Sequence, residues 1–282
     1  MIISQEFLSK INKIQLEILS NVIEVCDKLN LNYFMVHGSL LGAIQNSGFM
    51  PLDDDIDIAL PRADYNVFIT QAQKYLKEHY FIQSNLSEEK YPLPFAKVRD
   101  SRTTYVIEKM KHLNIHQGIY IDIFPIDYYK ANGIKSIIRH LEEKILNIRI
   151  GCVFLDENIT AKQKIRQFLS RVICPSYKRA IKRRDALYQI ETKSNFIIIT
   201  GGKKGERGIP KEWFADFIIK DFEGLKIKVP KEYDKYLRAI YGDYKNYDVA
   251  DSNRISDNQV KVNACAIDLN KPFTNVLYKL GE

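Results

Sequence analysis

The chain has 282 residues, with 42 Lys and Arg against 35 Asp and Glu, and therefore a formal net charge of +7. Apolar residues make up 45% and charged residues 27%, a balance typical of globular proteins that excludes a mainly disordered chain. No run of about 18 apolar residues is present, and the first residues lack the apolar region of a signal peptide. We therefore expect no transmembrane helix and a cytoplasmic location.

The first part of the chain has the spacing of a helix followed by a strand and a tight turn. Apolar residues between Ile11 and Leu29 recur every three or four positions, which predicts a long amphipathic helix. A short buried strand is expected at 33–37. Gly38 and Ser39 then break the strand, and the apolar residues after them begin a second helix.

An acidic strand follows. Ile56 and Ile58 alternate with aspartates as in a half-buried strand. Pro61 ends this strand and suits the first turn of a helix that continues to about Glu78. Short strands are expected near 95–98, 103–107 and 119–124, and the residues from 133 to about 191 are mainly helical in pattern.

These elements predict an α+β or α/β fold with a mixed sheet and a helical subdomain. We divide the chain into an α/β core at 1–130, a basic helical segment at 131–195 and a C-terminal part at 196–282 that packs back on the core. The last part begins with a strongly apolar run at 196–199.

The excess of positive charge comes from residues 160–184, which hold nine basic residues and no acidic one. Without these nine, the chain would have 33 basic against 35 acidic residues. The same segment carries apolar residues at helical spacing: Ile165, Phe168, Leu169, Val172 and Ile173. A basic amphipathic stretch is typical of contact with an anionic membrane or a polyanion, and the alternative is a solvated basic face of a helical subdomain.

Residues 53–57 predict a metal site. If the strand begins early enough, alternation places Asp53, Asp55 and Asp57 on one face. Three like charges at this spacing repel one another unless a cation lies between them. Because only oxygen ligands are available nearby, a hard ion such as Mg²⁺ or Mn²⁺ is expected. An exposed acidic turn is the alternative.

Two further motifs complete a candidate site. Gly38 and Ser39 open a helix directly after an apolar strand, which presents backbone N–H groups and a hydroxyl to a phosphate. Asp122 lies in the middle of an apolar strand, where an unpaired carboxylate would be very unfavourable. It is therefore expected to be either a third metal ligand or the base that accepts a proton from a hydroxyl group. Asp127, after Pro125, is expected to cap a loop.

Basic and imidazole side chains near these motifs have their own expected places. Lys97 and Arg99 alternate on a short strand and are expected to bind a diphosphate, with a solvated strand face as the alternative. His112 and His116 are expected on the surface. His37 lies beside the Gly-Ser turn and is expected to pack or to form a hydrogen bond.

A Gly-Ser turn, an Asp-x-Asp strand and a later strand aspartate are together typical of the nucleotidyltransferase fold shared with polymerase β. Four sequence blocks go further and closely resemble the LicD family: HGSLLGAIQNSGFMPLDDDIDIALPRADY at 37–65, KVRDSRTTY at 97–105, GIYIDIFPID at 118–127 and WFADFIIKDFEGLKIKVPKEYDKYLRAIYGDY at 213–244. Residues 1–130 would then be a nucleotidyltransferase-like catalytic core.

The resemblance also implies a chemistry. LicD proteins and their relatives fukutin and fukutin-related protein use a CDP-activated donor and move a phosphorylated group, such as phosphocholine or ribitol phosphate, onto a glycan hydroxyl. By this resemblance Asp55 and Asp57 are the metal-binding positions, with Asp53 as a possible neighbour. Asp122 is the third acidic position. Gly38 and Ser39 form the turn that holds a phosphate.

We therefore expect Mg²⁺-dependent transfer of phosphocholine from CDP-choline to a cell-surface glycan precursor of the teichoic acid, capsule or lipopolysaccharide type, with release of CMP. The alternatives are transfer of ribitol or glycerol phosphate from a CDP-alditol, a template-free nucleotidyltransferase that uses a nucleoside triphosphate, and a non-catalytic binding module. The acceptor is expected to be lipid-linked, with residues 160–184 in peripheral contact with the inner face of the plasma membrane. No specific nucleic acid partner is expected.

Overall fold

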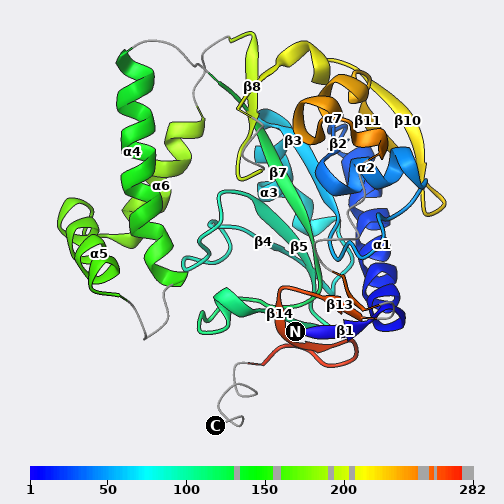
Figure 1. Ribbon diagram of the computed structural model, residues 1–282, viewed down its shortest axis with the longest axis horizontal. Helices are drawn as coiled ribbons and strands as arrows, with labels where there is room; N and C mark the ends of the chain where they lie inside the picture. The colour runs from blue at the N-terminus through cyan, green and yellow to red at the C-terminus, as the bar shows by residue number, and fades with distance from the viewer. Residues whose placement is uncertain are drawn as a thin grey trace.

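A seven-stranded mixed sheet lies at the centre of the computed structural model (Figure 1). The structure describes residues 1–129, 134–154, 160–189, 194–202, 207–246, 254–256 and 259–274. Within these residues the chain is mixed α+β, with seven α-helices. The predicted combination of helices with a mixed sheet is confirmed. The boundary predicted at 130/131 falls outside the described residues.

The sheet is organised around its longest strand, β7 (Tyr120–Tyr128). β3 (Asp57–Pro61) runs parallel to β7 on one side. On the other side, β5 (Ala96–Asp100) pairs antiparallel with the first half of β7, and β8 (Phe196–Ile199) pairs with its last residues. The sheet is completed by β2 (Phe34–Met35) beside β3, β4 (Tyr80–Gln83) beside β5 and β9 (Arg207–Pro210) beside β8.

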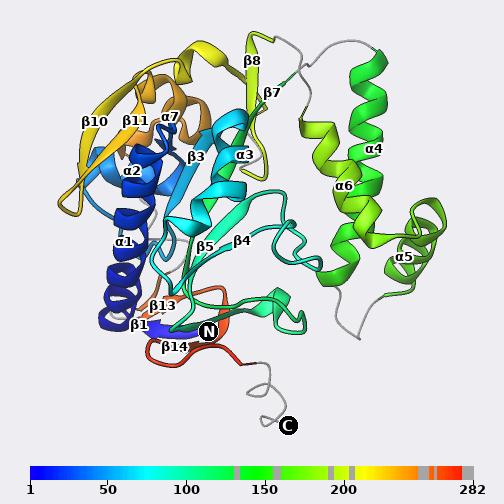
Figure 2. The same ribbon diagram turned by 180° about the vertical axis from the view of Figure 1, so that it is seen from behind.

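Helices α1 (Gln5–Lys28) and α3 (Arg62–Gln71) cover one face of the sheet (Figure 2). α1 begins where the Ser4 side chain accepts a hydrogen bond from the Phe7 N–H, and its apolar stripe is buried in the main core. Side chains alternate along β3 and β7, so successive residues point in turn toward these two helices and toward the opposite face of the sheet.

Smaller elements surround the sheet. α2 (His37–Gln45) contacts β3 and the hairpin of β10 (Phe217–Phe222) and β11 (Leu225–Pro230). The remaining pairs are β6 (Thr104–Ile107) with β14 (Ala264–Asp268), and β13 (Gln259–Lys261) with both β1 (Ile2–Ser4) and β12 (Arg254–Ser256). α7 (Tyr233–Tyr241) and the short 3₁₀ helices Ala72–Lys74, Glu108–Met110, Cys152–Phe154, Lys211–Phe214 and Tyr244–Asn246 complete the described elements.

Helices α4 (Ile134–Gly151), α5 (Ala161–Ile173) and α6 (Tyr177–Tyr188) form a lobe beside the sheet (Figures 1 and 2). The lobe has a small core of its own, made of Leu146, Ile150, Ala180 and Ile181. Among the described helices, none combines the length and the apolar character needed to span a membrane.

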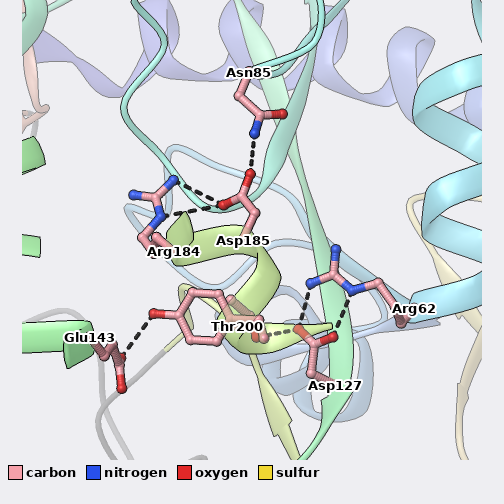
Figure 3. Close-up of polar contacts among 8 residues, drawn as sticks. Arg62, Asn85, Asp127, Glu143, Arg184, Asp185 and Thr200 are labelled. Carbon is pink, nitrogen blue, oxygen red and sulfur yellow. Dashed lines mark hydrogen bonds and ion pairs between the residues drawn. The ribbon is translucent and has the colours of Figure 1, made fainter. Parts of the chain in front are cut away.

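The lobe is attached to the sheet region through α6 (Figure 3). Arg184 is 2% exposed, and its Nη1 donates a hydrogen bond of 2.6 Å to the Pro92 carbonyl. The Asp185 carboxylate accepts a hydrogen bond from the Asn85 side chain. These buried polar contacts fix α6 against the loop between β4 and β5.

Several predicted elements are confirmed, and others differ in their bounds. The first helix, the strands near 95–98, 103–107 and 119–124, and the helical pattern after 133 are present in the described residues. The third helix is shorter than predicted, because α3 ends at Gln71 and only a 3₁₀ turn continues to Lys74. β3 is buried on both faces rather than one, since α2 and α3 both pack on it. The pattern gave no signal for β4 or for the hairpin of β10 and β11.

Candidate metal and phosphate site

Three aspartates meet where β3 and β7 begin. The parallel register places Asp57 opposite Asp122, and Asp55 lies two residues before Asp57 in the loop that enters β3. One carboxylate oxygen from each of the three residues lies within 4.8 Å of the others. We call Asp55, Asp57 and Asp122 the carboxylate cluster. Asp57 and Asp122 are each only 7% exposed.

The backbone around the cluster is fixed by hydrogen bonds between segments far apart in the sequence. The Asp122 N–H donates to the Ile56 carbonyl (2.8 Å), and the Val36 N–H donates to the Asp57 carbonyl (3.1 Å). Ile56 and Ile58 are fully buried and anchor the strand that carries Asp57. The cluster is therefore held by the core itself.

Asp53 is placed differently from the sequence-based expectation. The strand begins only at Asp57, so residues 53–55 form a loop and do not alternate as a strand. Asp53 belongs to a second group of carboxylates with Asp54 and Asp55. A Cβ atom at position 38 would lie 2.9 Å from Asp53 Oδ2, which shows how closely the backbone of Gly38 approaches this loop.

Burial makes the carboxylate cluster electrostatically unfavourable by itself. Burial, with repulsion from Asp57 and other aspartates, raises the pKa of Asp55 well above its usual value. Burial also raises the pKa of Asp122 to about 6, although Lys97 acts in the opposite direction. Closely spaced oxygen ligands that repel one another are the donor set that a hard divalent cation stabilises. The residues present therefore fit Mg²⁺ or Mn²⁺.

Lys97 lies directly against the cluster. It is opposite Asp122 in the register of β5 and β7, and its Nζ donates a hydrogen bond to Asp122 Oδ1. The same Nζ lies 3.6 Å from the centre of the Tyr120 ring, and its pKa is lowered by burial. The alternative of a solvated strand face is wrong for Lys97, because its side chain is only 3% exposed.

Arg99 is on the same face as Lys97 and is fully buried. Its Nε donates to Gln83 Oε1 (2.5 Å) and its Nη1 donates to the Gly118 carbonyl (2.6 Å). Nη2 has no hydrogen bond partner among the described residues. Most of the Arg99 guanidinium is thus used within the protein, and the diphosphate role expected for Arg99 stays a prediction.

The Gly38-Ser39 segment forms the first turn of α2. The helix begins at His37, which was expected to end the preceding strand, and so includes Gly38 and Ser39 ahead of the apolar residues predicted to begin it. His37 has a positive φ of 54°. The Ser39 hydroxyl accepts the Asp57 N–H at 2.9 Å, so this side chain positions the first residue of β3 directly. The first-turn N–H groups of a helix have no partner within the helix and can bind an anion.

His37 has the structural role expected from its position. Its Nδ1 lies 3.1 Å from Asp57 Oδ2, and its ring packs edge-on against Phe124 with ring centres 4.9 Å apart. His37 is 2% exposed. The prediction that it packs or forms a hydrogen bond is confirmed, and both contacts orient Asp57.

Two other expectations are wrong. Asp127 is not a loop cap, because it forms a bidentate ion pair with Arg62, with contacts of 2.6 and 2.5 Å, and accepts a hydrogen bond from Thr200 (Figure 3). This pair lies on the α3 side of the sheet, away from the carboxylate cluster. His116 is not a surface residue, because it is largely buried and its Nδ1 accepts the Gly118 N–H at 3.2 Å.

Sequence reasoning missed the side chains that support the acidic loop. Gln15 of α1 is 1% exposed and donates to the carbonyls of Asp54 (2.8 Å) and Tyr120 (3.2 Å). Tyr105 of β6 donates its hydroxyl to Asp54 Oδ2 at 2.8 Å. A signal for Gln15 was present, since it interrupts the apolar stripe of α1 between Ile11 and Ile18. A buried polar residue in such a stripe needs a partner.

Comparison with known proteins is consistent with this arrangement. Residues 30–147 match the family model described as LicD/FKTN/FKRP, nucleotidyltransferase domain. The chain is 26% identical over 235 residues to the lipopolysaccharide cholinephosphotransferase LicD of Haemophilus influenzae, covering 81% of this chain and 88% of that protein. It is also 27% identical over 124 residues to an uncharacterized protein of Rickettsia typhi, covering 44% of this chain and 38% of that protein.

The predicted resemblance is thereby confirmed. The matched range contains the carboxylate cluster, the Gly-Ser turn, Lys97 and Arg99. The match to the Haemophilus influenzae protein extends well beyond this range.

Proposed function

We propose, from the match of residues 30–147 to the LicD family model, that the protein transfers phosphocholine from CDP-choline to a hydroxyl of a cell-surface glycan precursor, releasing CMP. The observation that carries the proposal is the carboxylate cluster, in which oxygens of Asp55, Asp57 and Asp122 lie within 4.8 Å of one another beside the first turn of α2. We further propose that these residues belong to a nucleotidyltransferase fold.

Phosphocholine is proposed as the transferred group because of the similarity to the Haemophilus influenzae enzyme, whose name describes cholinephosphotransfer on lipopolysaccharide. The aromatic rings closest to Lys97 do not decide between donors, because Tyr120 and Phe95 already face the ammonium of Lys97 at 3.6 and 5.4 Å. Ribitol or glycerol phosphate therefore remains an arm of the experiment.

In this reaction an acceptor hydroxyl oxygen forms a bond to the phosphorus that carries choline, and the bond from that phosphorus to the oxygen of CMP breaks. Asp55, Asp57 and Asp122 would hold Mg²⁺, which neutralises charge on the donor diphosphate when bound. The N–H groups of the first turn of α2 face a donor phosphate, and Ser39 keeps Asp57 in position. Lys97 and Arg99 Nη2 supply further positive charge on the same face of the sheet.

Asp122 can act either as a third ligand or as the acceptor of the hydroxyl proton. The two roles differ in what Asp122→Asn changes. Loss of a ligand raises the Mg²⁺ concentration needed for half-maximal rate, whereas loss of the proton acceptor lowers kcat at saturating Mg²⁺.

The experiment is mass-resolved CMP release by the full chain with Mg²⁺ and, separately, CDP-choline, CDP-ribitol, CDP-glycerol or CTP. Thermal stabilisation by each donor is measured in parallel, because hydrolysis without an acceptor is slow. We expect CMP only from CDP-choline and a loss of about a hundredfold or more in Asp57→Asn, since the cation site supplies several kcal/mol. Asp221→Asn, the same change at an exposed position of the β10–β11 hairpin, is the control and should keep the activity.

Other outcomes would redirect the assignment. CMP release from CDP-ribitol or CDP-glycerol alone would replace choline with an alditol and keep the transferase class. Pyrophosphate release from CTP alone would show nucleotidyl transfer and contradict the proposal. Equal activity of Asp57→Asn and the control would remove the carboxylate cluster from the mechanism.

A further inference from the structure

Helix α5 turns its polar side toward the protein and its apolar side toward solvent, the reverse of an ordinary surface helix. Its polar side faces α4. On this side Ser170 of α5 is 3% exposed, and its Oγ lies 3.7 Å from the sulfur of Cys152, which directly follows α4. Gln163 and Gln167 are on the same side and line a cavity of about 570 Å³ between α4 and α5. The side of α5 that contacts the rest of the protein is therefore hydrophilic.

The apolar side of α5 faces solvent. It consists of five residues, each between 52% and 67% exposed, that we call the α5 apolar stripe: Ile165, Phe168, Leu169, Val172 and Ile173. Their spacing places them on one face of the helix. The first half of α4 exposes a second apolar set, between 54% and 76% exposed: Ile134, Ile137, Ile138 and Leu141.

Folding of the chain does not explain this orientation. An amphipathic helix normally buries its apolar face, and a large exposed apolar patch is typical of an interaction site. The lobe could have buried Phe168 and Leu169 by rotating α5, yet it buries Ser170 instead. The stripe is thus available to something outside the described chain.

Basic residues border the stripe on both sides. At 100° per residue, Lys162 and Arg166 lie along one edge of the stripe, and Lys164 and Arg171 lie along the other. All four are exposed, and within the described ranges none of them pairs with a carboxylate. Unpaired cations along the edges of an apolar stripe match lipid headgroups above an acyl layer.

Three of the five basic residues that follow α5 in this segment have other partners. Arg184 is buried against Pro92, Arg183 pairs with Glu142 at 2.5 Å, and Lys178 lies 3.5 Å from Glu89. The sequence-based expectation of a contact through the whole of 160–184 is therefore narrowed to α5. In both views α5 lies on the far side of the lobe from the sheet, where a flat surface can reach it (Figures 1 and 2).

We propose that α5 binds the surface of an anionic lipid bilayer, with its apolar stripe inserted among the acyl chains and its four basic residues against the headgroups. A second copy of the chain fits less well, because two such helices face to face would bring their cationic edges together. The proposal does not depend on the transferase activity, since it is tested without any donor or acceptor.

The test is co-sedimentation of the full chain with vesicles of phosphatidylcholine and phosphatidylglycerol, and with vesicles of phosphatidylcholine alone. We expect binding to the anionic vesicles that weakens as salt is raised. The double variant Phe168→Gln, Leu169→Gln should bind at least about tenfold more weakly, because each side chain loses the transfer into the acyl layer. Lys162→Gln, Arg166→Gln should bind several-fold more weakly.

Two controls match these variants. Leu86→Gln removes a side chain that is 65% exposed and lies outside the lobe, and Lys178→Gln, Arg179→Gln removes the same charge from α6. Both should bind like the unchanged protein. All variants change exposed residues, and equal thermal unfolding midpoints would show that they fold alike.

The proposal is overturned if the unchanged protein does not sediment with anionic vesicles, or if the α5 variants bind as well as the controls. It is also overturned if sedimentation velocity without lipid shows a dimer that Phe168→Gln, Leu169→Gln dissociates. That result would assign the stripe to a second copy of the chain.

Discussion

The sheet buries charged side chains of its strands, whereas the lobe of α4, α5 and α6 leaves apolar side chains in solvent. Around the sheet, Asp57, Asp122 and Lys97 are each at most 7% exposed, and Arg99 is fully buried. In the described part of the lobe, the core has four buried apolar residues, and the α5 apolar stripe is more than half exposed. The two regions therefore distribute polarity in opposite ways.

The difference teaches how the two regions serve different kinds of binding. A large apolar core offsets the desolvation of a few charges and fixes them in place, which suits the binding of an ion and a phosphate. Three short helices bury little surface, but they can present a stripe that becomes buried only on contact with a partner. Three predictions test this comparison, in order of decreasing effect.

The largest effect is expected for a buried ion pair. Asp127→Ala removes the partner of Arg62 and should lower the free energy of unfolding by about 3 to 5 kcal/mol, because a mostly buried guanidinium is left without its carboxylate. Arg183→Ala breaks the Arg183–Glu142 pair on the surface of the lobe and should leave stability unchanged. Urea unfolding followed by circular dichroism measures both. Equal effects would contradict the contrast between the two regions.

A pair of glycines tests packing density. A Cβ at Gly42 in α2 would lie 2.3 Å from the Gly48 carbonyl oxygen and 2.8 Å from the Met50 nitrogen, so Gly42→Ala should destabilise the protein by about 1 to 3 kcal/mol. At Gly151, the last residue of α4, an added Cβ would meet no atom within 4 Å in the described residues beyond its own helix backbone and chain neighbours. Gly151→Ala should raise stability by up to about 1 kcal/mol through helix propensity. A fall in stability in the lobe variant would show that α4 is packed as tightly as the core.

The smallest effect concerns His116. Burial lowers the pKa of His116 to about 4, whereas an unfolded histidine titrates near 6.5. Between these values the unfolded chain holds more protons, so this residue makes stability fall as the pH drops below about 6.5. The expected loss is about 1 kcal/mol from about pH 7 to about pH 5.5.

The measurement compares the pH dependence of unfolding in the unchanged protein and in His116→Gln, with His112→Gln as the exposed control. Taking the difference between proteins removes the contribution of the aspartates, including Asp122 with its pKa of about 6, which acts in the opposite direction. The slope should flatten in His116→Gln alone. An unchanged slope would mean that His116 is accessible to protons in the folded state.

The sequence by itself determined the first helix, the acidic strand and the residue types of the site. Periods of 3.6 and 2 residues are local, so α1 and the strands at β5, β6 and β7 could be predicted from spacing. Asp122 was recognised because a carboxylate in an apolar strand needs a partner. The LicD motifs were sufficient to indicate a resemblance to this family, which the comparisons confirm.

Only the tertiary structure decided which residues meet. The register of β3 and β7 places Asp57 opposite Asp122, and that of β5 and β7 adds Lys97, but no spacing within one segment specifies a register between strands. Asp53 lies outside the carboxylate cluster because β3 begins only at Asp57, four residues after it. The orientation of α5 was equally invisible, since a helical pattern identifies an apolar face but does not determine whether that face meets a core or solvent.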